Sequence, residues 1–402
     1  MELVKDFKEL KKNLKKDFSA FKKIKVAVLG DSATQFLVQA LRGLGCEEKT
    51  DYEIFEADYN QIDRQVLDPS SELYEFDAEF IVIFESASKL WKKFSVKNQE
   101  GKNGFAASHI QHVKDLYETI SSRSKSKVIY FNFQEMDDRV FGNFSNKTPQ
   151  SFLYQLRKIN FELMDLSSQY KNLFILDYCY LSSHAGHSVS FDTKMYYTSE
   201  MVLSIDILPA LAKNISDIIL SITGKFKKCL ILDLDNTTWG GIIGDDGIEN
   251  IQVGELGIGK VFTELQLWAK QLKERGIILA VCSKNNEETA KEPFKNHPDM
   301  VLRLDDISVF VANWDNKADN IKYIQSILNI GFDSMVFLDD NPFERNLVRQ
   351  FIPEINVPEL PEDPALYLDF LKKLNLFETA SYTDEDKNRT QQYKQEAERV
   401  IT

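Results

Sequence analysis

The chain has 402 residues, of which 43% are hydrophobic and 28% charged, and its net charge is −13. This length predicts two domains, and this composition is typical of a water-soluble globular protein. The acidic balance argues against nucleic acid and membrane lipid as partners, because both attract basic surfaces.

Basic residues are concentrated at the N-terminus, where the first 25 residues hold nine lysines. Apolar side chains recur there at helical spacing, which predicts an amphipathic helix over residues 1–23. Two interpretations are open: a helix on a membrane surface, or a helix docked on its own domain. The second is favoured because exposed lysine faces are common in soluble proteins.

Residues 24–222 alternate between apolar, strand-like runs and helical stretches. The strand-like runs are IKVAVLGDS, YEIFEADY, AEFIVIFES, SKVIYFNF and NLFILDY. The stretch from Ser32 to Gly45 predicts a helix that ends at the glycine. This order predicts crossover units on a parallel sheet covered by helices on both faces.

Residues 223–378 repeat the same kind of alternation. The strand-like runs are CLILDLD, GIILAVCSK, MVLRLDD and SMVFLDDN, and helices are expected over residues 259–276 and 317–331. The predicted fold class is therefore α/β, with two doubly wound (Rossmann-like) parallel-sheet domains. Residues 379–402 are polar and predict an exposed helix or linker.

Four cysteines lie far apart with no CxxC pair, and we find neither a secretory signal nor an apolar run of membrane-spanning length. Dispersed cysteines favour a reducing compartment. A cytoplasmic location is therefore expected.

Polar residues stand where three strands of the second half end and where one helix begins. They are Asp233 and Asp235, Ser283, Lys317, and Asp339 and Asp340. The carboxyl ends of parallel strands meet at one edge of a sheet, so these side chains are expected to lie together. Crowded carboxylates need a cation, and oxygen ligands favour Mg²⁺. Serine and lysine at the same edge suit a phosphate group.

These residues resemble the four motifs of the haloacid dehalogenase (HAD) superfamily. DLDNT matches its first motif, and Ser283, Lys317 and the Asp339–Asp340 pair resemble the other three. The wider blocks DNTTWGGIIGDDG, VCSKNN, NWDNKADNI and FLDDNPFER are similar to the FkbH-like branch, with Thr238 in place of the usual leucine.

The resemblance implies a phosphatase mechanism. Asp233 is expected to form an aspartyl-phosphate, and Asp235 to transfer the protons. The expected Mg²⁺ ligands are Asp233, Asp235 through its backbone carbonyl, and Asp339 or Asp340. The expected phosphate contacts are Ser283, Lys317, Lys284 and Asn285.

The spacing of the motifs leaves no room for a separate cap domain, and Trp239–Gly247 is expected to form only a small flap. The resemblance to capless members of this superfamily implies an open site for a protein-borne or otherwise bulky substrate. The expected partner is a phosphorylated small molecule or a carrier-bound substrate. Trp239 is expected either to contact substrate or to pack in the core.

The first half resembles the SGNH hydrolases in its opening block, VAVLGDSAT, which places Ser32 at a strand-to-helix turn. The block around Asn132 lacks the usual glycine and aspartate, and Met195 stands where the catalytic histidine belongs. His184 and His187 are near in sequence, so an esterase with a displaced base stays open. The favoured role is a non-catalytic scaffold or docking domain.

Three functions therefore remain. The first is a Mg²⁺-dependent phosphatase, and the second is an FkbH-like glyceryl transfer from a phosphorylated three-carbon acid to an acyl or peptidyl carrier protein. The third is a partner-docking module in which catalysis is secondary.

Overall fold

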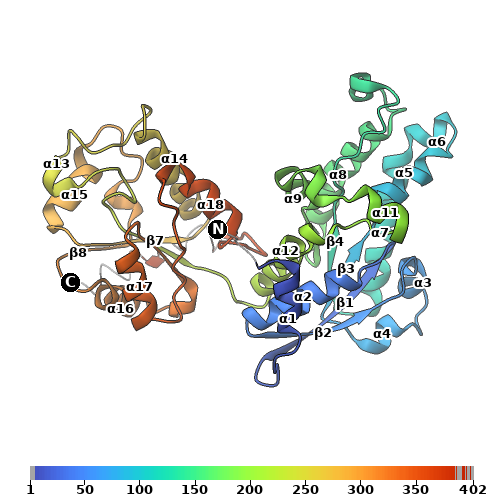
Figure 1. The fold of residues 1–402 in the computed structure, drawn as a ribbon, viewed down its shortest axis with the longest axis horizontal. Helices are drawn as coiled ribbons and strands as arrows, with labels where there is room; N and C mark the ends of the chain where they lie inside the picture. The colour runs from blue at the N-terminus through green and yellow to red at the C-terminus, as the bar shows by residue number, and fades with distance from the viewer. Residues whose placement is uncertain (1–4, 385, 387–391, 394, 396–398, 400–402) are drawn as a thin grey trace. The chain divides into compact units, whose positions relative to one another are not determined.

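The structure is a computed structural model that describes residues 5–384, 386, 392, 393, 395 and 399. The chain divides into two compact units, Met1–Ile219 and Leu220–Thr402. Each unit is built around its own sheet (Figure 1). No helix in the described part of the chain is long and apolar enough to cross a lipid bilayer.

The N-terminal unit holds a sheet of five parallel strands in the order β2-β1-β3-β4-β5. Their bounds are β1 (Lys22–Gly30), β2 (Thr50–Glu56), β3 (Phe80–Phe84), β4 (Lys127–Phe131) and β5 (Leu173–Leu176). Every residue of the central strand β3 is buried. Its unbroken apolar run is the pattern of a strand covered on both faces.

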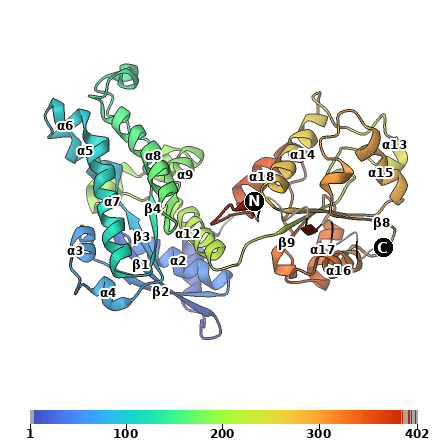
Figure 2. The same cartoon turned by 180° about the vertical axis from the view of Figure 1, so that it is seen from behind.

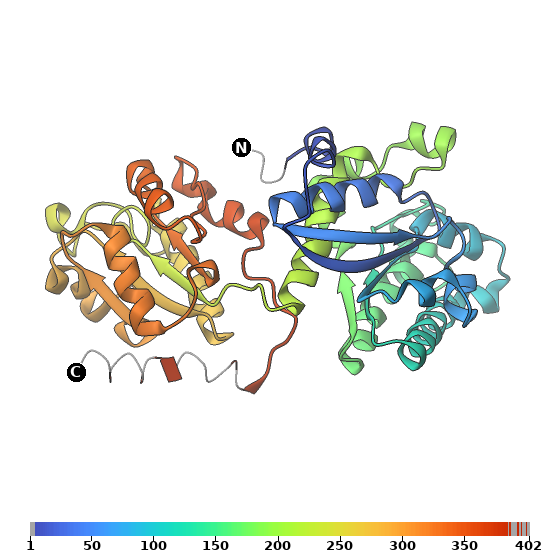
Figure 3. The ribbon, with the colours of Figure 1, turned by 90° about the horizontal axis from the view of Figure 1, so that it is seen from below.

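Helices lie on both faces of this sheet. They are α1 (Phe7–Asn13), α2 (Gln35–Glu47), α3 (Ile62–Leu67), α4 (Glu72–Phe76), α5 (Ala87–Ser95), α6 (Gln99–Asn103), α7 (Phe105–Arg123), α8 (Phe152–Gln169), α9 (Tyr178–Ala185), α10 (His187–Ser190), α11 (Thr193–Ser199) and α12 (Leu208–Ile222). Two 3₁₀ turns, η1 (Gly142–Lys147) and η2 (Ile205–Ile207), join them. Helices α7 and α8 run side by side (Figure 2). Seen from below, α1 and α2 lie on the opposite side of the sheet from α7 (Figure 3).

The N-terminal helix is shorter than the predicted span of residues 1–23. Helix α1 ends at Asn13, and β1 begins at Lys22. The side chain of Asp17 accepts hydrogen bonds from the backbone and the hydroxyl of Ser19, forming a local turn that competes with a helix. The apolar face of α1 is used inside its own unit, because Leu10 is fully buried and Phe7 packs on Phe36.

Helix α2 continues past its predicted end at Gly45 and stops at Glu47. Gly45 has another reason to be glycine: a Cβ there would lie 2.4 Å from the carbonyl oxygen of Thr50. The residue therefore permits close packing of α2 against β2 and does not end the helix.

The C-terminal unit holds four parallel strands in the order β8-β7-β6-β9. They are β6 (Cys229–Leu232), β7 (Ile278–Ser283), β8 (Val309–Ala312) and β9 (Met335–Leu338). The helices are α13 (Ile243–Asp246), α14 (Gly259–Glu274), α15 (Glu287–Asn296), α16 (Lys317–Leu328), α17 (Pro342–Phe351) and α18 (Tyr367–Leu374), with 3₁₀ turns η3 (Leu304–Asp306), η4 (Phe332–Ser334) and η5 (Pro364–Leu366). Two apolar clusters cover the two faces, one under α14 and α18 and one under α16 and α17 (Figure 1). The predicted α/β class with two parallel sheets is confirmed.

One predicted strand, MVLRLDD at residues 300–306, is wrong. The strand at this position in the sheet is β8, which begins at Val309. The backbone N–H groups of Val301 and Leu302 donate to the side chain of Gln266, and Leu304–Asp306 form a 3₁₀ turn. A side chain thus takes the hydrogen bonds that a neighbouring strand would otherwise make.

The chain between β6 and β7 contains only α13 and α14, and the chain between β8 and β9 only α16 and η4. No further domain is inserted at either point of this fully described stretch. The predicted polar helix or linker at 379–402 falls largely outside the described residues.

Candidate active site

The site lies where β6 and β9 run side by side at the point where the strand order reverses. Asp233 directly follows β6, and its backbone N–H donates to the carbonyl of Leu338, the last residue of β9. Asp339 follows at once. Where the strand order reverses, the chain connections that follow adjacent strands run to opposite sides and leave a crevice between the carboxyl ends of the strands. The two carboxylates meet in this crevice.

A buried lysine joins the two carboxylates. The ammonium of Lys317, at the first turn of α16, lies 2.9 Å from Oδ2 of Asp233 and 2.6 Å from Oδ2 of Asp339. All three residues are buried, and Asp339 is fully so. Burial without a partner would cost several kcal/mol per charge, so the shared lysine is what makes this arrangement tolerable.

Burial and charge act in opposite directions on these groups. Burial raises the pKa of Asp233 to about 6, although Lys317 pulls it down. Burial likewise raises the pKa of Asp339 against the effect of Lys317. For Lys317, burial lowers the pKa, but the two carboxylates outweigh it and raise the value. The lysine is therefore charged, and Asp233 is ionised near neutral pH.

Three carboxylates converge near this cluster. Asp233, Asp339 and Asp340 each offer one oxygen, and these oxygens lie within 4.8 Å of one another. The Oδ1 atom of Asp233 is buried with no hydrogen-bond partner among the described residues. Burial, and then the charge of Asp233, raises the pKa of Asp340. Three converging acids, of which two contact one lysine, and an oxygen without a partner form a donor set that fits a hard divalent cation.

Asp235 faces a different set of partners. Its Oδ1 accepts from the indole Nε1 of Trp239 and from the backbone N–H of Ile243, each at 3.0 Å. Its Oδ2 accepts from Nδ2 of Asn285 at 3.0 Å, and the same amide lies 3.1 Å from the hydroxyl of Ser283. Its carboxylate is thus fixed beside the cluster but is not one of the three converging groups.

Lys284 is the predicted phosphate contact that the structure directs elsewhere. Its ammonium lies 2.6 Å from Oε1 of Glu344, a mostly buried carboxylate at the start of α17. The structure therefore brings together Asp233, Asp235, Ser283, Asn285, Lys317, Asp339 and Asp340 at one edge, with the Lys284 charge already neutralised.

Comparison with known proteins matches residues 25–220 to the family described as FkbH, N-terminal domain. The crystal structure of the N-terminal part of the protein BF1531 from Bacteroides fragilis is 54% identical over 94% of this chain and 100% of that chain, with a TM-score of 0.91. The chain belongs to the FkbH-like family. That crystal structure contains a phosphatase domain and is complexed with Mg.

A second solved structure, the lipase Lip_vut3 from a goat rumen metagenome, matches this FkbH-like chain at 10% identity over 49% of the chain and 96% of the lipase. Its TM-score of 0.35 is too low to support a structural argument. No curated protein matches the chain significantly.

Two residues that support the FkbH-like site, Thr238 and Arg345, were not assigned to it from the sequence, whereas Trp239 was expected either to contact substrate or to pack in the core. Trp239 is fully buried, packs edge-on against Phe294 and orients Asp235, so it belongs to the core and not to a flap surface. Thr238, the departure from the family wording, donates its hydroxyl to the carbonyl of Asp233 at 2.6 Å. Arg345 donates to the carbonyls that follow β9.

Some of these roles were readable in the sequence. An arginine five residues after the acidic pair, in DDNPFER, has the donors to hold loop carbonyls. The bond from Trp239 to Asp235 was not readable, because it requires the turn between them to close. Asn236 in that turn has a positive φ of 55°.

In the N-terminal unit, no hydrogen bond among the described residues joins Ser32 to Asn132, His184 or His187. Ser32 is buried, and its hydroxyl has no hydrogen-bond partner among the described residues. The amide of Asn132 is held by Asp177 and Cys179. His184 lies beside the carbonyl of Tyr180.

Proposed function

We propose that the C-terminal unit is a Mg²⁺-dependent phosphatase of the HAD type that works through an aspartyl-phosphate on Asp233. The observation that carries this proposal is the buried Asp233–Lys317–Asp339 cluster with a third carboxylate beside it. The phosphatase domain and Mg of the related Bacteroides structure support it. The expected substrate is a phosphorylated small molecule or a carrier-bound phosphoester.

Asp233 is the nucleophile in this proposal. One of its carboxylate oxygens bonds to phosphorus while the bond from phosphorus to the leaving oxygen breaks. A pKa of about 6 keeps the group ionised at neutral pH yet more basic than an ordinary aspartate. Lys317, which already faces this carboxylate, stabilises the negative charge on the phosphoryl oxygens.

Asp235 moves the protons. It gives a proton to the leaving oxygen in the first step. In the second step it takes a proton from the water that attacks phosphorus and releases inorganic phosphate from Asp233. To reach the leaving oxygen, its Oδ2 exchanges the amide of Asn285 for the substrate. Such general acid–base help contributes roughly 10²–10⁴-fold.

Asp233, Asp339 and Asp340 are the side chains that would hold Mg²⁺, together with the backbone carbonyl of Asp235. When bound, the ion supplies positive charge that offsets repulsion between the anionic nucleophile and phosphate. Arg345 fixes the loop that carries Asp339 and Asp340 by donating to both of their carbonyls.

The test is phosphate release from p-nitrophenyl phosphate with Mg²⁺ by the Asp233→Asn variant. We expect release to fall to the rate without enzyme. The matched control is Asp245→Asn, because Asp245 is an exposed acid on α13 and should leave the rate unchanged. Normal release by Asp233→Asn would show that the proposal is wrong.

A second candidate is glyceryl transfer to the thiol of a carrier protein, with loss of phosphate from a phosphorylated three-carbon acid. Membership of the FkbH-like family and the lack of a domain inserted between β6 and β7 favour it. Incubation with phosphorylated glyceric acid, including its acyl phosphate, and an acyl or peptidyl carrier protein tests it. A carrier mass increased by one glyceryl group supports transfer, whereas free phosphate with an unchanged carrier supports hydrolysis.

A further inference from the structure

A cavity of about 630 Å³ opens in the N-terminal unit beyond the carboxyl end of β4. Its lining comes from the loop after β4 and from η1, α5, α8 and α10. A second hollow of about 390 Å³ shares Ser88, Met136 and Phe191 with it, so the two form one groove. Volumes of this size are typical of sites for small ligands.

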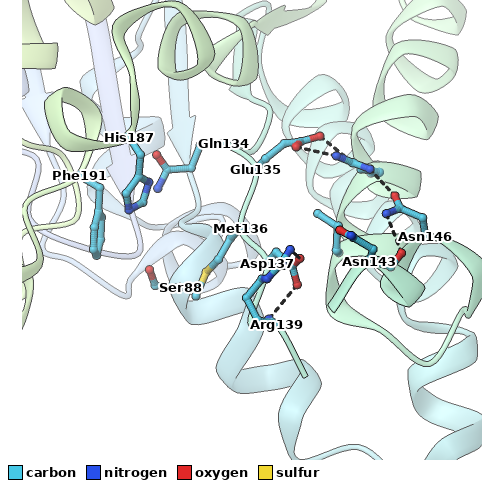
Figure 4. Close-up of a pocket in the computed structure, with 12 residues that line it drawn as sticks. Ser88, Gln134, Glu135, Met136, Asp137, Arg139, Asn143, Asn146, His187 and Phe191 are labelled. Carbon is cyan, nitrogen blue, oxygen red and sulfur yellow. Dashed lines mark hydrogen bonds and ion pairs between the residues drawn. The ribbon is translucent and has the colours of Figure 1, made fainter. Parts of the chain in front are cut away.

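In the first hollow, the charged side chains are already paired with one another. Arg157 forms a two-pronged contact with Glu135, with nitrogen–oxygen distances of 2.7 and 2.8 Å (Figure 4). Arg139 lies 3.3 Å from Asp137. An anionic or cationic ligand would have to break one of these pairs. The first hollow therefore favours a ligand without net charge. In the second hollow, Lys89 donates to Asn60, Lys92 lies over the ring of Tyr196, and Glu200 is exposed.

Two polar side chains that line the groove each keep a hydrogen-bonding atom free of protein partners. Ser88 and Gln134 are each only 5% exposed, and both line the cavity. The hydroxyl of Tyr178 donates to Oε1 of Gln134 and fixes the amide. Within the described residues, neither the Gln134 amide nitrogen nor the Ser88 hydroxyl makes a hydrogen bond. Both atoms are therefore available to donate to a ligand, and a ligand rich in hydroxyl groups offers matching acceptors.

Aromatic rings supply the apolar part of the groove. The rings of His187 and Phe191 stack 5.5 Å apart, and Figure 4 shows His187 beside Gln134. Trp91, Tyr196 and Tyr197 continue this surface along the second hollow. Flat rings next to hydrogen-bonding groups suit a ligand that has C–H faces and hydroxyl edges.

We propose that this groove binds a neutral polyhydroxylated ligand, an oligosaccharide long enough to occupy both hollows. Its hydroxyl edges contact Ser88, Gln134 and the outer atoms of the Arg157–Glu135 pair, and its ring faces lie on Phe191 and its neighbours. This site is separate from the acidic cluster of the C-terminal unit and requires no catalysis there.

Saturation-transfer NMR on the full chain, with cellotriose, xylotriose, chitotriose and maltotriose as separate probes, tests the proposal. We expect saturable binding of at least one trisaccharide, together with a change in tryptophan fluorescence that is lost in Trp91→Phe. Phe191→Ala and Gln134→Met should each weaken that binding about tenfold, the effect of losing about 1.4 kcal/mol. Asp233→Asn should bind normally, which separates this site from the proposed phosphatase.

The matched control is Phe161→Ala, which removes an exposed aromatic ring from α8 outside the groove and should bind as the unaltered chain does. Asn143→Ala, an exposed lining residue, gives a second test if Gln134→Met fails to fold. Failure of all four sugars to saturate overturns the proposal. Binding of adenosine or orthophosphate in their place, sensitive to Phe191→Ala, also overturns it.

Discussion

The ammonium of Lys317 lies 2.6 Å from Oδ2 of Asp339, and both side chains are buried. Because a second carboxylate, Asp233, contacts the same ammonium, removal of the lysine leaves two buried acids with no opposing charge. We expect Lys317→Met to lower the free energy of unfolding of the C-terminal unit by about 3–5 kcal/mol without Mg²⁺. Urea unfolding in a Trp91→Phe background measures this, since the other three tryptophans lie in that unit.

A double-mutant cycle tests whether Lys317 and Asp339 interact directly. Asp339→Asn in the Lys317→Met background removes one of the two stranded charges and should restore part of the lost stability. If the effects of the two substitutions on the free energy of unfolding simply add, a direct interaction between the two side chains is contradicted. Lys295→Met is the matched control, because its contact with Glu288 is exposed and should change stability by less than about 1 kcal/mol.

The indole of Trp239 orients Asp235 through one hydrogen bond. Trp239→Phe keeps an aromatic ring in the core but removes the donor. We expect kcat for phosphate release to fall roughly tenfold with little change in KM, and the unfolding free energy to fall by about 1–2 kcal/mol. Trp314→Phe alters an exposed ring and serves as control. An unchanged kcat in Trp239→Phe would mean that the orientation of Asp235 is unimportant.

Mg²⁺ should stabilise the C-terminal unit because it relieves repulsion among three converging acids. At about one hundred times its dissociation constant, the ion should add about 2.7 kcal/mol. Thermal unfolding with MgCl₂ or with EDTA measures the shift. Asp340→Asn should abolish most of it, whereas Asp245→Asn should retain it. A full shift in Asp340→Asn would remove that residue from the ligand set.

His109 makes the stability of the N-terminal unit sensitive to acid. Burial lowers its pKa from 6.5 to about 4, although Glu85 opposes this. Below pH 6.5 the unfolded chain binds a proton that the folded unit takes up only near pH 4. Stability should therefore fall, by up to about 3 kcal/mol, as pH drops through this window.

Native-state hydrogen exchange of the β4 amides between pH 7 and 4 measures that loss. His109→Gln should remove this part of the pH dependence, while His184→Gln, an exposed substitution, should keep it. Burial raises the pKa of Asp31 to about 6, so this group makes stability rise as pH falls. Its contribution is the same in all these variants. An unchanged pH profile in His109→Gln would contradict the assignment.

Sequence patterns determined the two parallel sheets, because apolar runs such as residues 80–84 and 229–232 can be buried on both faces only in this architecture. They failed at residues 300–306, where alternating apolar residues resemble a strand but a side chain of α14, Gln266, takes the backbone hydrogen bonds. A sequence pattern does not show that a side chain from another helix will take the backbone hydrogen bonds of a strand-like run.

The sequence by itself determined that Asp233, Ser283, Lys317 and Asp339 gather at one edge, since each follows a strand or begins a helix of the same sheet. Only the tertiary structure decided what each charge faces: Lys317 joins two acids, whereas Lys284, one residue beyond β7, turns to Glu344. The physical reason is distance. Strand order fixes where a backbone ends to within a few ångströms, but an ion pair depends on side-chain directions that only the packed helices α16 and α17 set.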